Sequence, residues 1–462
     1  MSVIDDDKND LGPSTQLKKV NSPRLMATSS SWNMSQSIFT MVVGAAVTAI
    51  AARVYGPEIL GKFTFSMAFV GLFTSVATLG IEPIVVRHLV ERRHREGTIL
   101  ATALVLRAVG GLLVSVLCVT FVALLNQDKT VILLTLIMSL TLAVRASEVY
   151  LYWLRSQLEL RLASLFRIGS YGGVAAARVV AVLLGAPIEV YAAFYLLDIV
   201  VYSVLLFVAF RRVAKHRPRM NISKNYARVL LASSWYLIVT GIATMAYNRI
   251  DQVMLGSMLP GHRAAGLYAA AAAIGEMWYF VPAALVTAIQ PSLFASSSRK
   301  LADERGADML LIVCSVSLLF GSVVFALAGG ALGVLYGAEF VEASASLRVL
   351  SLAGVIAMVV LCQNALYVAW GAQKYSALFT TLGALLNVVL NLVWIPTLGI
   401  AGAALATLVT QFVVCLVLPA CFSATRPVYG VMLRSTNPHL LIGHLKRMSF
   451  MIRRRYKGGI NA

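Results

Sequence analysis

The chain has 462 residues, of which 59% are apolar and 13% are charged, and its mean hydropathy is +0.80. A soluble domain is near half apolar and about a quarter charged, so this composition excludes an ordinary water-soluble protein. The net charge of +19 taken alone could indicate nucleic acid as a partner, but its distribution along the chain argues against that.

Apolar segments of about twenty residues, the length that crosses roughly 30 Å of hydrocarbon as a helix, recur through most of the chain. They are too numerous for a signal peptide. We expect an all-α polytopic membrane protein with about twelve transmembrane helices. The predicted spans cover residues 32–52, 63–86, 98–125, 130–154, 162–184, 188–210, 227–250, 265–295, 307–328, 346–370, 375–395 and 399–424.

The segments outside the spans divide the chain into parts. Residues 1–31 are polar, with four aspartates against four basic residues, and predict a disordered cytoplasmic tail. The longest internal cytoplasmic loop, 211–226, is the most basic and separates the spans six and six. We therefore expect an N-terminal lobe over 32–210 and a C-terminal lobe over 227–424.

Residues 425–462 form a second basic cytoplasmic tail. After Pro438, apolar and basic side chains fall on largely opposite faces of a helix. This pattern predicts a short interfacial helix on the cytoplasmic leaflet, and a solvated, frayed tail is the alternative.

The basic residues predict the orientation. With the amino terminus inside, 30 of the 39 lysines and arginines fall in cytoplasmic segments, and about four fall in external turns. Under the positive-inside rule, both termini are cytoplasmic, in a cell (inner) membrane protein. The excess charge then faces anionic membrane lipid. The external basic residues are Lys62, Lys129, Arg263 and Arg348.

The two halves show weak internal likeness. Gly61 opens the second span and Gly266 opens the eighth in similar short motifs, and Pro83 and Pro291 are expected to interrupt the far ends of those spans. Repeated halves with interrupted helices at corresponding positions are typical of transporters, because a broken helix frees backbone groups to line a cavity.

Ionisable residues inside the spans are the most informative features. Each costs about 2.5–3.5 kcal/mol at the bilayer centre on insertion scales, so each needs a partner or a wet cavity. They are Arg53, Glu82, Arg107, Arg145, Glu148, Arg178, Asp198, Arg249, Asp251 and Glu276.

Some of these charges can be satisfied within the protein. Arg145 and Glu148 are three residues apart on one helical face, which suits a structural ion pair. Arg178 and Asp198 could pair across neighbouring helices.

Other charges are harder to satisfy. Arg249 and Asp251 point to different sides of one helix, so one of them should face the cavity. Arg107 has no carboxylate within its own span and is the best single candidate for meeting a bound anion, unless it pairs with another helix. Guanidinium groups match the geometry of phosphate oxygens, so these arginines suit a phosphate-bearing substrate.

Amide side chains inside the last spans could donate to and accept from sugar hydroxyls. They could equally hold helices together without any substrate. They are Gln363, Asn364, Asn387, Asn391 and Gln411.

No cofactor, metal or nucleotide is expected. The segment Gly56–Phe63 fits the spacing of a phosphate-binding loop, but Phe63 stands where that loop needs a Ser or Thr, and the segment follows a helix on the external side. The five cysteines all fall inside predicted spans without a CxxC pair, and free cysteine is a common small packing residue.

Three passages resemble a known family: YGPEILGKF (55–63) running on to LGIE (79–82); NRIDQVMLG (248–256) with AGLYAAA (265–271) and QP (290–291); and WIPTLGIAGAA (394–404). They are similar to the polysaccharide and O-antigen flippases of the multidrug, oligosaccharidyl-lipid and polysaccharide exporter superfamily. The resemblance implies two six-helix lobes around a central, often cationic cavity that alternates between leaflets. It also implies a polyprenyl-pyrophosphate-linked glycan as cargo, with polysaccharide-assembly proteins as further candidate partners.

We therefore expect a non-enzymatic flippase of a lipid-linked oligosaccharide or polysaccharide precursor. Only Arg249 and Asp251 sit in a matching motif; the other candidates rest on the charge and hydrogen-bonding arguments. The predicted substrate-binding residues are Arg107, Arg145, Arg178, Arg249, Asp251, Asn364 and Asn387.

Three alternatives stay open to different degrees. A cation-coupled exporter of small molecules with the same architecture would depend on Asp198, Asp251 or Glu276, although the first span lacks the carboxylate that the superfamily's drug exporters commonly use there. A membrane glycosyltransferase or polymerase would need a larger external loop than the short connections here provide. A structural scaffold would leave the intramembrane charges unexplained.

Overall fold

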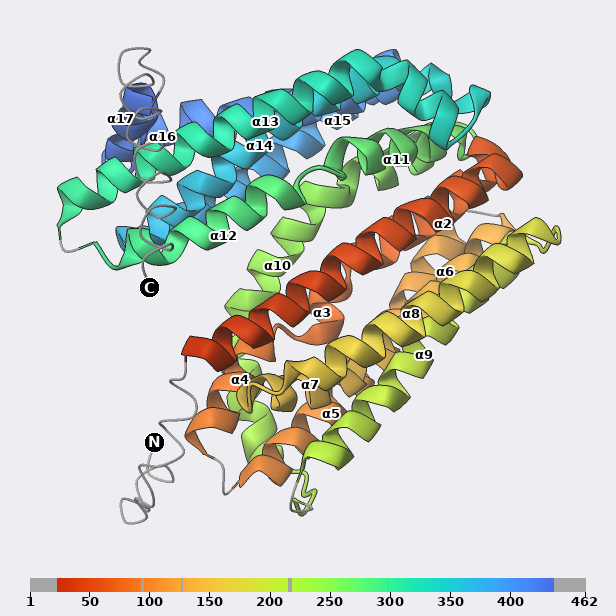
Figure 1. Ribbon diagram of the computed structural model, residues 1–462. Helices are drawn as coiled ribbons and strands as arrows, with labels where there is room; N and C mark the ends of the chain where they lie inside the picture. Colours follow the sequence, from red (N-terminus) through yellow and green to blue (C-terminus); the bar gives the residue numbers. More distant parts are fainter. Residues whose placement is uncertain (1–22, 93–94, 126–127, 215–217, 297, 436–462) are drawn as a thin grey trace, which may run out of the picture.

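The computed structural model describes residues 23–92, 95–125, 128–214, 218–296 and 298–435. Those residues form helices joined by short connections, with no strand among them. Figure 1 shows the helices packed in two groups. The N-terminal lobe contains α2 to α9 and the C-terminal lobe α10 to α17, and α10 contacts helices of both lobes.

The N-terminal lobe contains the first six predicted spans. Its two buried apolar clusters join residues of every long helix in the lobe, so the lobe has its own core. Its elements are α2 (Pro23–Leu72), α3 (Thr74–Thr78), α4 (Glu82–Glu91), α5 (Glu96–Leu125), α6 (Lys129–Val144), the 3₁₀ turn η2 (Arg145–Ser147), α7 (Glu148–Ser156), α8 (Leu160–Leu183) and α9 (Ile188–Val213).

The C-terminal lobe contains the other six predicted spans. Most of its apolar core is formed by α11, α13 and α14 together with α15. The elements are α10 (Lys224–Met258), α11 (Arg263–Glu276), α12 (Phe280–Phe294), α13 (Arg299–Leu335), the 3₁₀ helix η3 (Ala338–Ala343), α14 (Ser344–Ala369), α15 (Gln373–Phe412), the π-helical turn η4 (Val413–Val417), α16 (Leu418–Cys421) and α17 (Arg426–Ser435).

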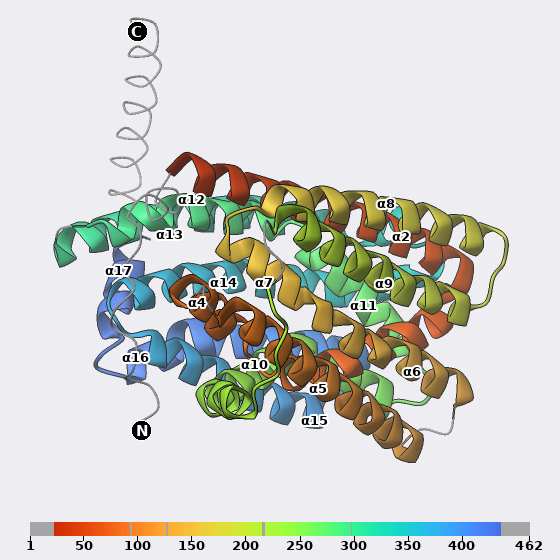
Figure 2. The same ribbon diagram turned by 90° about the horizontal axis from the view of Figure 1, so that it is seen from below.

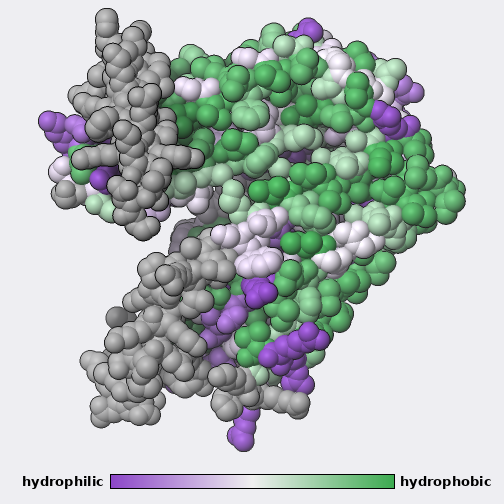
Figure 3. Space-filling view, viewed as in Figure 1, coloured by the Kyte–Doolittle hydropathy of each residue, from purple (hydrophilic) through white to green (hydrophobic). Residues whose placement is uncertain are grey.

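The all-α, multi-pass membrane architecture is confirmed. Nine helices in the described ranges are long and apolar enough to cross a membrane, or ten when the bent pair α11 and α12 counts as one. Large apolar side chains are exposed along these helices, and Figure 3 shows them covering much of the visible face. Hydrocarbon rather than water suits such a surface. The number twelve stays a prediction, because two pairs of predicted spans lie on continuous helices.

Those two pairs turn at single glycines. α2 bends at Gly56, with φ of 70° and Pro57 next to it. α15 bends at Gly399, with φ of 57°, three residues after Pro396. Positive φ costs glycine little, and each proline removes a backbone donor at the corner, so these sequences turn the chain without a loop.

Spans two, four and eight are interrupted, which matches the expected breaks in spans two and eight. The prolines are not where those breaks occur, however, and this part of the prediction is wrong. Span two breaks at Leu79 and Gly80, both with positive φ, and Pro83 lies in the first turn of α4. Span eight bends by 42° between α11 and α12, whereas Pro291 lies inside α12.

The tails differ from expectation in one place. α2 begins at Pro23, inside the segment predicted as a disordered tail, so that boundary is corrected to an earlier residue. α17 occupies the start of the predicted carboxy-terminal tail and packs on α13 and α16. The interfacial helix expected after Pro438 lies outside the described residues.

The lobes touch at one end of the molecule. A Cβ atom added at Gly61 of α2 would lie 1.8 Å from the carbonyl oxygen of His262, and one at Gly266 of α11 would lie 2.0 Å from that of Pro57. Glu58 accepts a hydrogen bond from the backbone N–H of His262 at 3.2 Å. Only glycine allows this approach of backbone to backbone.

Away from that contact α10 still packs on α3 and α5, and Figure 2 shows α10 beside α5 in the view from below. Figure 1 shows α12 and α13 separating from the first turns of α2, and Figure 3 shows the surface hollowed between the lobes at the same end. The molecule is therefore closed at one end and open at the other.

Candidate functional site

A buried arginine cluster forms where span four is interrupted. The guanidinium of Arg107, on α5, is 1% exposed and donates to Glu148 at 2.8 Å and to the hydroxyl of Tyr152. Arg145 of η2 lies 3.3 Å from the other oxygen of Glu148 and is 33% exposed. A mid-helix 3₁₀ turn often marks a functional position, and here it brings two arginines to one carboxylate.

The expected pairing of Arg145 with Glu148 is thus confirmed. Arg107 pairs with a carboxylate of another helix, which is the alternative that the sequence offered to meeting a bound anion. Because Glu148 carries a single negative charge, the three residues together hold one excess positive charge.

A second group lies between α8 and α9. Asp198 is 1% exposed and forms an ion pair with Arg167 at 3.0 Å, so the pairing with Arg178 that the sequence left possible is not the one formed. The guanidinium of Arg167 also lies over the rings of Tyr171 and Tyr202.

Arg178 is 5% exposed and its guanidinium lies over the rings of Tyr191 and Tyr195. Within the described ranges no carboxylate lies within ion-pair distance of it, and its Nε has no hydrogen-bond partner. Cation–π contacts stabilise such a cation by about 2 kcal/mol or more when desolvated, which does not neutralise it. The N-terminal lobe thus places four arginines among its helices, with Arg107 and Arg178 buried and Arg145 and Arg167 partly exposed, against two carboxylates at 148 and 198.

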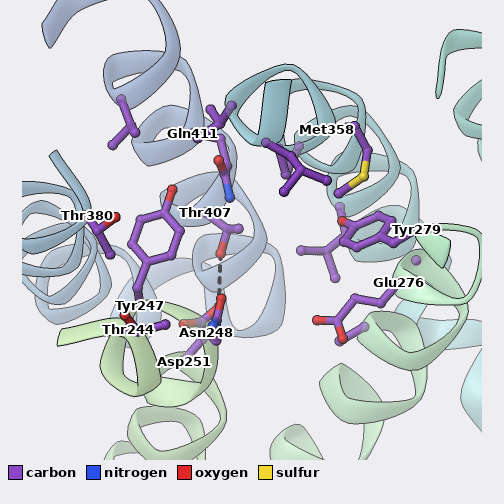
Figure 4. A pocket seen from close by; sticks show the side chains of 18 of the residues that line it. Thr244, Tyr247, Asn248, Asp251, Glu276, Tyr279, Met358, Thr380, Thr407 and Gln411 are labelled. Carbon is purple, nitrogen blue, oxygen red and sulfur yellow. Dashed lines mark hydrogen bonds between the residues drawn. The ribbon is translucent and has the colours of Figure 1, made fainter. Parts of the chain in front are cut away.

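The C-terminal lobe contains a cavity of different character. It has a volume of about 550 Å³, in the range of small-molecule sites, and is lined by α10, α11, α14 and α15. Figure 4 shows Tyr247, Gln411 and Glu276 directed into the same space from three helices. Neither lysine nor arginine is among the lining residues.

Asp251 lines this cavity and is 6% exposed. One of its oxygens accepts hydrogen bonds from the hydroxyls of Tyr268 and of Thr407, the latter at 2.9 Å (Figure 4). The other oxygen accepts no hydrogen bond from the described residues. Neutral hydroxyls, rather than a basic residue, therefore hold this carboxylate.

Arg249 pairs with Glu276 across α10 and α11, with 3.7 Å between nitrogen and oxygen. Both side chains are nearly half exposed, so the pair is loose and accessible. Of the neighbours Arg249 and Asp251, it is Asp251 that lines the cavity.

The amides divide into two groups. Asn364 and Gln411 line the cavity, and Asn364 accepts a hydrogen bond from Ser376 at 2.7 Å. Asn387 is 2% exposed, accepts from Asn391 at 2.9 Å and lies outside the lining. Of the two predicted amides, Asn364 lines the cavity, and Asn387 forms its hydrogen bond within α15.

Sequence reasoning missed the hydroxyl-bearing residues of the cavity. Their signal was present: tyrosines and threonines recur inside apolar spans, where a hydroxyl needs a partner. They are Thr244, Tyr247, Tyr268, Tyr279, Thr380 and Thr407.

Comparison with known proteins agrees with this architecture. A model of the family described as polysaccharide biosynthesis protein matches residues 26–297, more than half of the chain. The chain belongs to this family. Over 189 residues it is 26% identical to the probable low-salt glycan biosynthesis flippase Agl15 of Haloferax volcanii, and the match covers 39% of each chain. The chain thus spans well under half the length of that relative.

Solved structures share the fold of this chain. The lipid II flippase MurJ, in an inward closed conformation, matches with a TM-score of 0.67 and 15% identity, over 87% of this chain and 89% of that one. The multidrug transporter DinF-BH matches with a TM-score of 0.60 and 14% identity, over 92% and 100%. Likeness at this identity shows a shared fold alone.

Proposed function

We propose that this protein flips a polyprenyl-pyrophosphate-linked oligosaccharide or polysaccharide precursor from the cytoplasmic to the outer leaflet of the cell membrane. Membership of the polysaccharide biosynthesis protein family supports a role in glycan assembly. The relative Agl15, named a probable glycan biosynthesis flippase, supports lipid-linked cargo.

The observation that carries the proposal is the excess positive charge buried in the N-terminal lobe. Arg107 and Arg145 share one carboxylate, and Arg178 has none in the described part of the chain. Uncompensated charge inside a membrane protein is costly, and a pyrophosphate supplies the missing negative charge with oxygens that match a guanidinium. Arg145 is the accessible member of the group.

Two ends of different openness suit an alternating-access cycle. The lobes touch at the end that contains Gly61 and Gly266, and α12 and α13 separate from the first turns of α2 at the other. With both termini cytoplasmic, as the basic residues predict, the touching end faces outward. The hollow between the lobes then receives cargo from the cytoplasmic leaflet, and no covalent step is required of the protein.

A cation-coupled exporter of small molecules is the second candidate. It is favoured by the acidic cavity, in which Asp251 and Glu276 face a space of small-molecule size. Such a protein would depend on these carboxylates more than on the arginines of the N-terminal lobe.

Proteoliposomes with a fluorescent polyprenyl pyrophosphate distinguish the two. The full chain should move this probe between leaflets, and Arg145→Gln and Arg178→Gln should each reduce the rate by about tenfold, the effect of losing about 1.4 kcal/mol. Arg211→Gln, at an exposed position on the cytoplasmic end of α9, is the matched control and should keep the wild-type rate.

The result that contradicts a flippase is a wild-type chain that does not move the probe, and a rate that both arginine substitutions leave unchanged would contradict the role of the arginines. A rate that falls only in Glu276→Gln, with efflux of a cationic dye that depends on the same residue, would establish the small-molecule exporter instead. Interaction with other polysaccharide-assembly proteins stays a prediction.

A further inference from the structure

The proposed cargo has two chemically different parts, an anionic pyrophosphate and a hydroxyl-rich glycan. The two lobes differ in the same way. The N-terminal lobe buries more arginines than carboxylates, whereas the C-terminal cavity is lined by carboxylates, amides and hydroxyls without a basic residue. This inference rests on the proposed function and asks where the glycan is held.

The C-terminal cavity is unsuited to the pyrophosphate. A phosphate there would meet Asp251, which is already bonded only to neutral hydroxyls, and Glu276. Negative charges brought together in a cavity that holds little water repel each other strongly. Arg249 lies beside Glu276 but outside the lining of the cavity.

The same cavity is rich in acceptors that lack donors. Within the described residues, the second oxygen of Asp251 and the side-chain oxygen of Gln411 accept no hydrogen bond. Buried acceptors of this kind cost free energy until a donor arrives. The side-chain oxygen of Asn364 already accepts a hydrogen bond from Ser376, so it is the amide nitrogen of Asn364 that can donate to a ligand.

The cavity therefore needs a ligand with many hydroxyl donors, some hydroxyl acceptors and no negative charge. Its volume of about 550 Å³ and the rings of Tyr247 and Tyr279 along its wall suit a small number of sugar units. A bare ammonium group or metal ion would satisfy the carboxylates and the free oxygen of Gln411, but it offers no acceptor to the amide nitrogens of Asn364 and Gln411.

We propose that the cavity between α10, α11, α14 and α15 is the binding site for the neutral sugar nearest the pyrophosphate of the lipid-linked glycan. The pyrophosphate lies against the arginines of the N-terminal lobe at the same time. The cargo then contacts both lobes at once, so its binding favours the conformations in which the lobes approach each other.

The specificity that follows is toward uncharged sugars. A sugar with a carboxylate at the first position would face Asp251 and Glu276 and lose affinity, since like-charge contacts at an interface cost several kcal/mol.

Binding to two probes tests the site. The full chain in nanodiscs is titrated with polyprenyl pyrophosphate and with the same lipid bearing one N-acetylglucosamine. Wild-type protein should bind the sugar-bearing lipid about tenfold more tightly, and Asn364→Leu combined with Gln411→Leu should abolish that difference, as expected for two lost hydrogen bonds. Binding of the bare lipid should stay unchanged.

Adjacent threonines on α15 provide a matched pair. Thr380 lines the cavity and Thr381 does not, and each hydroxyl donates to the carbonyl four residues earlier at 2.9 Å. Thr380→Val should weaken binding of the sugar-bearing lipid by about threefold, within the range of one weak hydrogen bond, and Thr381→Val should leave it unchanged.

The outcomes separate this inference from the proposed function. If both lipids bind equally well to wild-type protein, or if the double substitution weakens both, the sugar site is wrong while the flippase stands. If neither lipid binds, both are wrong. A gain in affinity that follows added sodium and not the sugar would make the cavity an ion site and overturn the inference.

Discussion

The two lobes hold the carboxylates among their helices in opposite ways. In the N-terminal lobe Glu148 and Asp198 each lie within 3.3 Å of arginine nitrogens. In the C-terminal lobe Asp251 is held by hydroxyls, and Glu276 has its only paired arginine, among described residues, at 3.7 Å. Arginines therefore neutralise the N-terminal carboxylates, whereas the C-terminal carboxylates remain available to a ligand.

The excess of one charge in each lobe comes from this difference in pairing. Two carboxylates cannot neutralise four arginines, so the N-terminal lobe stays positive even though most of its charged groups are paired. The C-terminal lobe stays acidic for the converse reason. A ligand with an anionic end and a hydroxyl-rich neutral end would suit both lobes at once. Four experiments test this difference between the lobes and the contact that joins them.

Removing a carboxylate that pairs with a buried arginine should have the largest effect on stability. Glu148→Gln leaves Arg107, which is 1% exposed, without a counter-charge, and breaking a buried pair costs about 3–5 kcal/mol. We expect a large fall in the midpoint of thermal unfolding in lipid. Glu91→Gln, which removes the partner of the 74% exposed Arg87, is the control and should cost about 0–1 kcal/mol. Equal effects would mean that Arg107 is solvated.

A single added methyl group should disrupt the contact between the lobes. Gly61→Ala places a Cβ 1.8 Å from the carbonyl oxygen of His262, and such overpacking costs about 1–3 kcal/mol. The closed end should open, which distance measurements between spin labels on α2 and α11 would detect. Gly71→Ala is the control on the same helix, because nothing lies within 4 Å of that position. Unchanged distances in Gly61→Ala would contradict the observed contact.

Removing an available carboxylate should cost little. Asn at position 251 can still accept from Tyr268 and Thr407, and its amide group replaces an oxygen that has no partner in the described ranges. Asp251→Asn should therefore change stability by less than about 1 kcal/mol, well below Glu148→Gln. A loss as large as that of Glu148→Gln, measured by the same thermal unfolding, would remove the contrast between the lobes.

The smallest expected effect is on pH. His262, in the turn between α10 and α11, is 5% exposed, and its burial lowers its pKa below 6.5, although Asp128 and Glu58 oppose the shift and Lys62 adds to it. Because the closed state binds the proton less well than the open state, the closed contact is fully stable above pH 6.5 and weakens as the pH falls below it. The spin-label distances should lengthen between pH 7 and pH 5 in wild-type protein.

His262→Phe is the control for that titration. Phenylalanine keeps a ring beside Phe65 and the backbone N–H that donates to Glu58, but it cannot take up a proton. A pH response that persists in His262→Phe would assign it to another group.

Hydropathy was sufficient to predict the helices. A stretch of about twenty apolar residues has few alternatives in a bilayer, because every backbone group must be satisfied within the segment. The boundaries of α5, α8 and α9 therefore lie within three residues of those expected. The bends at Gly56 and Gly399 were harder to predict, since a glycine with positive φ can replace a loop without interrupting the apolar pattern.

The charged site was only partly predictable. Arg145 and Glu148 could be paired from their spacing alone, because both lie on one helical segment. The partners of Arg107 and Asp198 come from other helices, and the rotation of one helix against another is not encoded in local sequence. The hydroxyls that hold Asp251 were missed for the same reason, because Tyr268 and Thr407 are 17 and 156 residues away.

The corner at Gly56 has a mechanical consequence. α2 has two helical arms, residues 23–55 and 57–72, that meet at the non-helical Gly56 without an intervening loop. The second arm contains Gly61, which touches the opposite lobe. A tilt of the first arm should therefore move the second arm and, with it, the contact at Gly61, so that α2 mechanically couples the two ends of the molecule.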